Sequence, residues 1–156
     1  ISLLLINPTS ADDFFHRAES KATLQDYKGA IDDYTKVIQF QPKNINAYYN
    51  RGFLFAVVQN YRAAIIDYTK VIELDPSNVN AYLNRGLCKA KAENQKGSQD
   101  DFRRAAEIDP QATAQYNNAA AHLRAGQKNT GTLNKLEGTE EYAKAKALEA
   151  IAKFCK

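Results

Sequence analysis

The amino-acid sequence predicts an all-α protein built from helix pairs that stack in a row. Three observations lead to this prediction. The chain repeats itself, because Tyr27–Gly52 and Tyr61–Gly86 are identical at 17 of 26 positions, at an offset of 34 residues. Apolar side chains recur inside each repeat at the spacing of one helix face. Pro42, Pro76 and Pro110 close successive repeats, where a residue without an N–H ends a helix.

The composition is that of an ordinary globular chain and limits the classes of partner. Apolar residues make up 44% of the 156 residues and charged residues 25%. The 21 Lys and Arg against 18 Asp and Glu give a net charge of +3. This balance does not predict a nucleic-acid-binding protein, for which a strong basic excess is typical. One domain is expected at this length.

The repeat divides the chain into units of two helices. In the middle unit, Tyr48, Gly52 and Phe55 share one face of the first helix, and Ala64 and Tyr68 share one face of the second. Such a unit cannot bury its own apolar faces, so stability is expected to come from stacking on its neighbours. The predicted array consists of the units 11–44, 45–78 and 79–112 and a partial unit 113–126.

This pattern resembles the tetratricopeptide repeat family. The family signature has an aromatic residue, a small one four positions later and a large apolar one, followed by Ala, an aromatic residue and Pro. The middle unit carries it as Tyr48, Gly52, Phe55, Ala64, Tyr68 and Pro76. The resemblance implies a right-handed α-solenoid of helix-turn-helix units, in a sequence style similar to bacterial or plastid members.

Both ends of the chain depart from the repeat. Residues 1–10 are read as an apolar arm on the first helices or as the remnant of a signal peptide. A signal remnant in residues 1–11 would place the protein in a periplasm or a thylakoid lumen, and otherwise it would be cytoplasmic. Residues 127–138 form a predicted loop insertion, and 139–156 a helix that caps the array. The alternative for that helix is a basic amphipathic segment that binds a membrane or a partner.

No motif predicts catalysis or a cofactor. The sequence has no phosphate loop, nucleophile elbow or zinc helix. His16 and His122 lie in different units without acidic or Cys neighbours at ligand spacing, and Cys88 and Cys155 form no CxxC pair, which leaves their redox state open. We therefore expect neither an enzyme nor a binder of metals, cofactors or small-molecule substrates.

Two charged columns recur at the period of the repeat. They are formed by Arg17, Arg51 and Arg85, and by Asp33, Asp67 and Asp101. Opposite charges that recur together predict structural ion pairs between first and second helices, within a unit or between neighbours. Partly exposed pairs would each stabilise the fold by only about 0.2–1 kcal/mol. The alternative is that the Arg residues bind an acidic ligand.

The resemblance also implies a binding surface, because in this family the first helices line the concave side and a ligand lies along them. The matching residues are Asn46, Tyr49, Asn50, Phe53, Asn80, Leu83, Asn84, Leu87, Asn117, Asn118 and Arg124. The first unit offers Asp12, Phe15, His16 and Glu19 at these positions.

A column of amides stands out on this expected surface. Asn50, Asn84 and Asn118 are 34 residues apart, and each amide could pair with the backbone of an extended peptide. The alternative is that they satisfy neighbouring groups between units. Apolar pockets are predicted from the residues Tyr49, Phe53, Leu83 and Leu87.

One function of the family is argued against. Chaperone-binding members clamp a carboxylate with Lys, Arg and Asn in set columns, but here those columns hold Phe15, Asn80, Asn84 and Glu19, and only Asn50 matches. We expect a scaffold or adaptor that binds an extended protein segment, for example in complex assembly, without a carboxylate clamp. The alternatives are a self-associating homo-oligomer and a regulatory domain of a larger protein.

Overall fold

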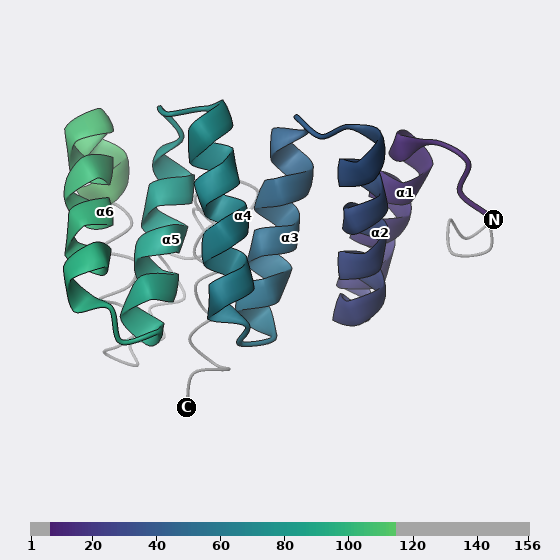
Figure 1. The fold of residues 1–156 in the computed structure, drawn as a ribbon, viewed down its shortest axis with the longest axis horizontal. Coiled ribbons are helices and arrows are strands. Elements are labelled where there is room, and N and C mark those ends of the chain that lie inside the picture. Colours follow the sequence, from purple (N-terminus) through teal and green to yellow (C-terminus); the bar gives the residue numbers. More distant parts are fainter. Residues whose placement is uncertain (1–6, 115–156) are drawn as a thin grey trace, which may run out of the picture.

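The protein is an α-solenoid in which three helix pairs stand side by side (Figure 1). The computed structural model describes residues 7–114, and this part contains no strand. Its helices are α1 (Ala11–Thr23), α2 (Tyr27–Phe40), α3 (Ile45–Val57), α4 (Tyr61–Leu74), α5 (Val79–Lys91) and α6 (Gln95–Ile108). The first helices begin 34 residues apart, and residues 110–114 are again helical. Residues 1–6 of the predicted arm, most of the fourth unit, the loop insertion and the capping helix lie outside the described residues.

Local sequence explains where each helix begins. The residue before each helix carries a short polar side chain that accepts a hydrogen bond from a backbone N–H three residues later. These residues are Ser10, Asp26, Asn44, Asn60, Asn78 and Asn94. Ser10 and Asp13 form a reciprocal capping box on α1. Between α4 and α5, Asn78 rather than Ser77 caps the next helix.

The helices of a unit approach closely because small residues lie between them. A Cβ atom on Gly52 would come within 3.1 Å of the Asp67 Cβ, and one on Gly86 within 3.1 Å of the Phe102 ring. Ala18 occupies the same place in the first unit and is fully buried. These contacts join α1 to α2, α3 to α4 and α5 to α6.

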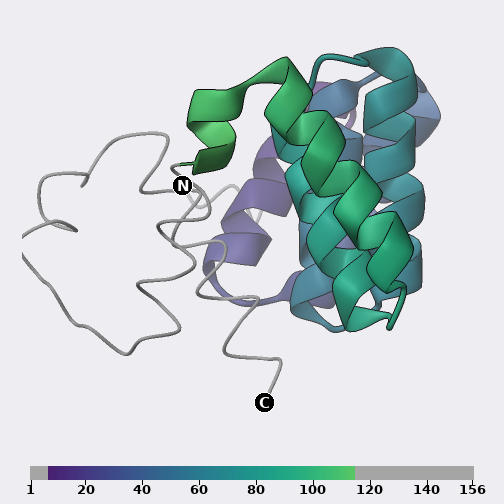
Figure 2. The same cartoon turned by 90° about the vertical axis from the view of Figure 1, so that its left-hand side faces the viewer.

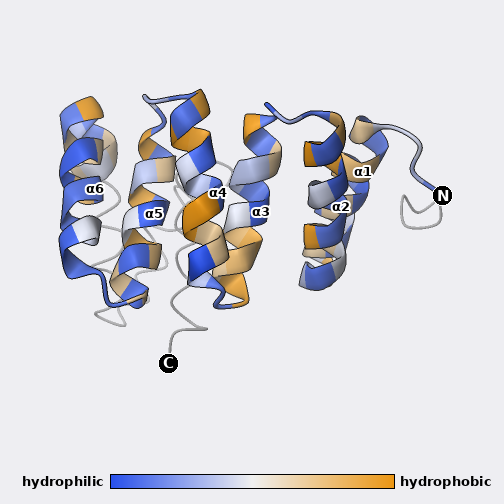
Figure 3. Cartoon of the chain, in the orientation of Figure 1, coloured by the Kyte–Doolittle hydropathy of each residue, from blue (hydrophilic) through white to orange (hydrophobic). Residues whose placement is uncertain are grey.

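Stacking between units buries a second set of residues. Ala47 and Leu54 of α3 pack into the core of the first unit, and Ala81 and Cys88 of α5 pack into the core of the second. The two equivalent positions of α1 hold Asp13 and Ser20, and neither side chain is buried. The outer face of α1 is therefore polar where the other first helices are apolar, as expected for a terminal unit of a solenoid. Figure 3 shows that α6 is also hydrophilic over most of its visible length.

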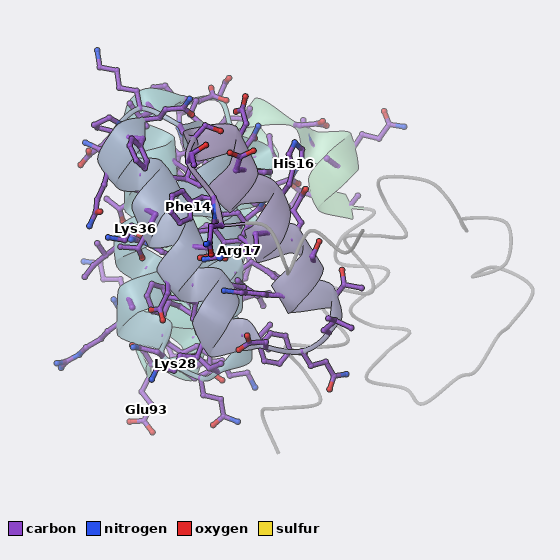
Figure 4. All side chains as sticks on the ribbon, turned by 90° about the vertical axis from the view of Figure 1, so that its right-hand side faces the viewer. Phe14, His16, Arg17, Lys28, Lys36 and Glu93 are labelled. Carbon is purple, nitrogen blue, oxygen red and sulfur yellow. The ribbon has the colours of Figure 1, made fainter. Side chains whose placement is uncertain are left out.

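Each unit is held by a bidentate hydrogen-bonded ion pair between its first and second helices. Arg51 donates from Nε and Nη2 to the two carboxylate oxygens of Asp67, at 2.8 and 2.7 Å. The other units contain the same bonds, at 2.7 and 2.7 Å from Arg17 to Asp33 and at 2.9 and 2.6 Å from Arg85 to Asp101. Figure 4 shows Arg17 between the two helices of its unit.

These ion pairs also connect neighbouring units. Arg51 donates from Nη1 to the hydroxyl of Thr35, and Arg85 donates in the same way to Thr69, both at 3.1 Å. Both Thr residues belong to the second helix of the preceding unit. The guanidinium group thus holds its own unit together with two N–H groups and contacts the previous unit with a third.

The expectation of weak, partly exposed pairs is wrong for the carboxylate partners. Only 2–4% of the side-chain surface of the three Asp residues is exposed, against 15–20% for the Arg residues. A buried carboxylate that loses its partner is left charged in a medium that solvates it poorly, so removing the Arg costs much more than an exposed pair is worth.

The three carboxylates differ in their pKa because the units differ in one residue. Burial raises the pKa of Asp33, but its bonds to Arg17 and Lys21 outweigh burial and hold the pKa below its usual value. The middle unit has Phe55 where the first has Lys21, so Arg51 is the cation that acts on Asp67. Burial there prevails and raises the pKa of Asp67. Stability from ionised Asp33 is present above its unfolded pKa and is lost as the pH falls through the lower folded value.

Replacing Arg51 by Met should therefore destabilise the protein by about 3–5 kcal/mol at neutral pH, because buried Asp67 loses its cation. The cost should shrink as the pH is lowered, because protonated Asp67 no longer needs a partner. Urea denaturation at several pH values measures both effects. The control is Arg62→Met on exposed Arg62, which should cost less than about 0.5 kcal/mol. An equal, pH-independent cost for both variants would contradict this account.

The turn inside each unit contains a residue in the left-handed backbone conformation. Gln25, Gln59 and Glu93 have φ angles of 63°, 63° and 62°. Such angles strain any residue with a Cβ by roughly 1 kcal/mol, and glycine adopts them freely.

Replacing Glu93 by Gly should raise the free energy of unfolding by about 0.5–1 kcal/mol, since the relief of strain exceeds the added freedom of the unfolded chain. Glu93→Ala is the matched control, because it removes the same charge and keeps the Cβ. Urea midpoints of the three proteins test the prediction, which fails if the Gly variant is no more stable than the Ala variant.

Candidate functional site

The predicted binding residues lie on the first helices, which the structure places next to each other. Helices α3 and α5 contact one another directly, in addition to their contacts with the second helices. Figure 2 views the row from its α6 end and shows the helices stacked behind one another. The predicted residues Asn117, Asn118 and Arg124 lie outside the described residues.

Most of the predicted residues in the described part remain accessible. Asn46 is exposed, and a larger set is partly buried. That set consists of Tyr49, Asn50, Phe53, Asn80 and Leu87. Phe53 packs on the cores of both the first and the second unit. The face therefore combines amide groups with aromatic and aliphatic edges.

Leu83 does not belong to an exposed apolar pocket, contrary to the expectation. Only 2% of its surface is exposed, and it packs in a cluster with Tyr82 and Ala105. The repeat places Leu83 in register with Tyr49, but the shorter Leu side chain is enclosed within the core of the third unit. Leu87, one turn later, is the partly accessible apolar residue of this helix.

The two described members of the amide column bond to tyrosines of the preceding unit. The Nδ2 of Asn50 donates to the Tyr34 hydroxyl at 3.2 Å, and the Nδ2 of Asn84 donates to the Tyr49 hydroxyl at 2.7 Å. The choice of partner follows from one residue: the first unit has Phe15 where the second has Tyr49, so Asn50 has no hydroxyl at that place and bonds to the second helix instead.

Burial separates the two amides. Asn84 is only 9% exposed, so in this structure it serves the contact between units. Asn50 is partly accessible, and within residues 7–114 its Oδ1 accepts no hydrogen bond. Burial also raises the pKa of Tyr34 to about 12, with a smaller contribution of the same sign from the Glu19 charge that outweighs the opposing effect of the Asn50 bond. Tyr34 therefore remains a neutral hydroxyl at physiological pH.

Aromatic rings support this face from below. The rings of Tyr49 and Tyr68 meet edge to face with centroids 5.5 Å apart, and Phe15 and Tyr34 meet in the same way at 5.3 Å. Such contacts fix ring orientation. The sequence analysis did not identify these pairs, although both lie at one register of the 34-residue period.

The described residues offer little for catalysis or metal binding. Residues 7–114 contain no group of three His, Cys, Asp or Glu side chains that could hold a metal ion. His16 lies 3.3 Å from Glu19 on the surface of α1, with both side chains more than half exposed. The buried Asp33, Asp67 and Asp101 are engaged by Arg residues. None of the helices in the described part combines the length and apolar character needed to cross a bilayer.

Comparison with protein-family models gives two overlapping matches. The model described as "TPR repeat" matches residues 21–56, and the model described as "Tetratricopeptide repeat" matches residues 45–78. The second match has the same limits as the middle unit derived from the sequence repeat. A search of curated protein sequences gives no match.

Several solved structures share the fold. The crystal structure of MamA protein is 22% identical with a TM-score of 0.64, over 69% of this chain and 58% of that chain. The first TPR of Spaghetti (RPAP3), bound to the HSP90 peptide SRMEEVD, is 23% identical with a TM-score of 0.62, over 68% and 84%. YrrB, described as a TPR protein with an unusual peptide-binding site, is 21% identical with a TM-score of 0.64, over 67% and 54%.

The chain thus spans little more than half the length of two of these proteins, and at such identities the likeness concerns the fold. The helix pairs, their 34-residue period, the signature residues and both family models agree. The repeats of this chain are tetratricopeptide repeats, and the protein belongs to that family.

Proposed function

We propose that the first-helix face binds an extended segment of a partner protein, and that the protein acts as an adaptor or assembly factor through this contact. A role in protein–protein interaction follows from the family and from its peptide-binding structural neighbours. The observation that carries the finer proposal is the accessible set on α3 and α5, where amide groups alternate with aromatic and aliphatic edges. These residues are Asn46, Tyr49, Asn50, Phe53, Asn80 and Leu87.

The chemistry of this face suits a backbone more than a charged group. An amide side chain both donates and accepts, as a peptide unit does, so Asn46 and Asn50 can pair with the main chain of an extended segment. Phe53 and Leu87 offer apolar contact to alternate side chains of such a segment. Recognition of this kind tolerates many sequences, and contacts of this size are typically of micromolar affinity.

A carboxylate clamp of the type that binds chaperone tails is not proposed. The Spaghetti domain was solved with the peptide SRMEEVD, which ends in Glu-Val-Asp. In the present chain the corresponding columns hold Phe15, Glu19, Asn80 and buried Asn84, and they provide no Lys or Arg. Exposed Glu19 would repel an acidic peptide.

The binding face can be tested without disturbing the core. Asn46→Lys combined with Asn80→Lys adds bulk and charge to the face, and should weaken binding of peptides selected from a random library on the wild-type protein by about tenfold or more. Fluorescence anisotropy with labelled peptides measures the effect.

The matched control makes the same chemical change on the second helices. Gln39→Lys combined with Gln99→Lys replaces two exposed amides of α2 and α6 and adds the same charge. Affinity should stay within about twofold of wild type, as expected for surface changes outside a contact. Equal losses in both variants would show that charge rather than location matters, and would refute the assignment of this face.

A further inference from the structure

Charges separate to the two edges of the solenoid. The helices alternate in direction, so the turns inside the units lie along one edge and the connections between units along the opposite edge (Figure 1). We call them the basic edge (residues 20–30, 54–64 and 88–98) and the acidic edge (7–14, 37–48, 71–82 and 105–114). Figure 4 shows Lys28 and Glu93 at the basic edge.

The basic edge carries six cations and two acids. The cations are Lys21, Lys28, Arg62, Lys89, Lys91 and Lys96, and the acids are Asp26 and Glu93. Lys21 and Lys89 are used in ion pairs with Asp33 and Asp101. The other four cations are exposed. Of these, Lys28, Arg62 and Lys96 follow the period of the repeat, because each is the second residue of its helix.

The acidic edge has the opposite composition. Its acids are Asp12, Asp13, Glu73, Asp75, Glu107 and Asp109, and its one cation is Lys43. Glu73 and Glu107 contact Lys70 and Arg104 one turn earlier, at 3.1 and 3.0 Å, but these pairs are about half exposed and only weakly neutralise the edge.

Apolar side chains accompany the charges on both edges. Leu24 and Val58 are 65% and 46% exposed in the turns of the basic edge, and Phe40 is 58% exposed on the acidic edge. In Figure 3 helix α3 ends in an apolar stretch at the basic edge. Each edge therefore offers apolar contact area among charges of one sign.

From these features we propose that the basic edge of one copy docks on the acidic edge of a second copy, head to tail. Charge complementarity favours this partner, and so does spacing: both edges belong to the same solenoid, so cations and acids recur with one spacing and can pair unit by unit. Leu24 or Val58 would then approach Phe40 of the other copy. Because the two surfaces differ, the contact is heterologous and leaves an acidic edge at one end and a basic edge at the other, so further copies can add.

Charge reversal on either edge provides the test. The variant Lys28→Glu, Arg62→Glu and Lys96→Glu has two acidic edges, and the variant Asp12→Lys, Glu73→Lys and Glu107→Lys has two more basic ones. Each variant alone should stay monomeric in sedimentation velocity runs at about 0.02 M salt, where wild type associates as its concentration rises. An equimolar mixture of the two variants should associate again.

Salt and a control variant complete the design. Raising the salt to about 0.5 M should weaken association of wild type at least tenfold, because screening shortens the reach of surface charges. Asp32→Lys combined with Asp100→Lys changes exposed acids away from both edges and should leave association intact. Circular dichroism verifies that every variant is folded.

Three results would overturn the proposal: wild type that stays monomeric at low salt, single variants that associate as wild type does, or a mixture that remains monomeric. Peptide affinity of the first-helix face is a separate measurement, so either result can fail without the other.

Discussion

The Arg guanidinium group that recurs in each unit connects the levels of this structure. Two of its N–H groups hold the buried Asp of its own second helix, and in Arg51 and Arg85 a third reaches the Thr of the preceding unit. One side chain thereby fixes both the angle within a helix pair and the stacking of that pair on the previous one. The small residue that follows it in sequence, Gly52 or Gly86, lets the helices come close enough for these bonds to form.

Much of the fold could be read from the sequence, since a 34-residue period with helical spacing and Pro at its end leaves few alternatives. The Arg–Asp columns were likewise visible as repeated opposite charges. Their Thr partners were not predicted, because Thr35 and Thr69 belong to other units than the Arg residues they meet, and register alone does not give distance. Leu83 and Asn84 were wrongly expected to be accessible, since the pattern identifies a helix face but not how deeply each residue on it is buried.

The candidate site differs from the core in how strictly the repeat is kept. Ala47 and Ala81, or Arg51 and Arg85, stay the same because they meet the same neighbours in each unit. On the first-helix face, Phe15, Tyr49 and Leu83 share one register position but differ in size and in the hydroxyl group. The single hydroxyl of Tyr49 redirects the bond of Asn84 relative to that of Asn50. Differences between units, rather than the shared pattern, thus give this surface its individual shape.

The polar outer face of α1 has a consequence for how such an array could lengthen. A further unit placed before α1 would set Asp13 and Ser20 against an apolar surface and leave polar groups without water or partners. A duplicated copy of residues 45–78 inserted after the middle unit would instead meet the same neighbours that the original already has. Growth of this protein, whether by duplication of its gene or by protein engineering, is therefore favoured in its interior.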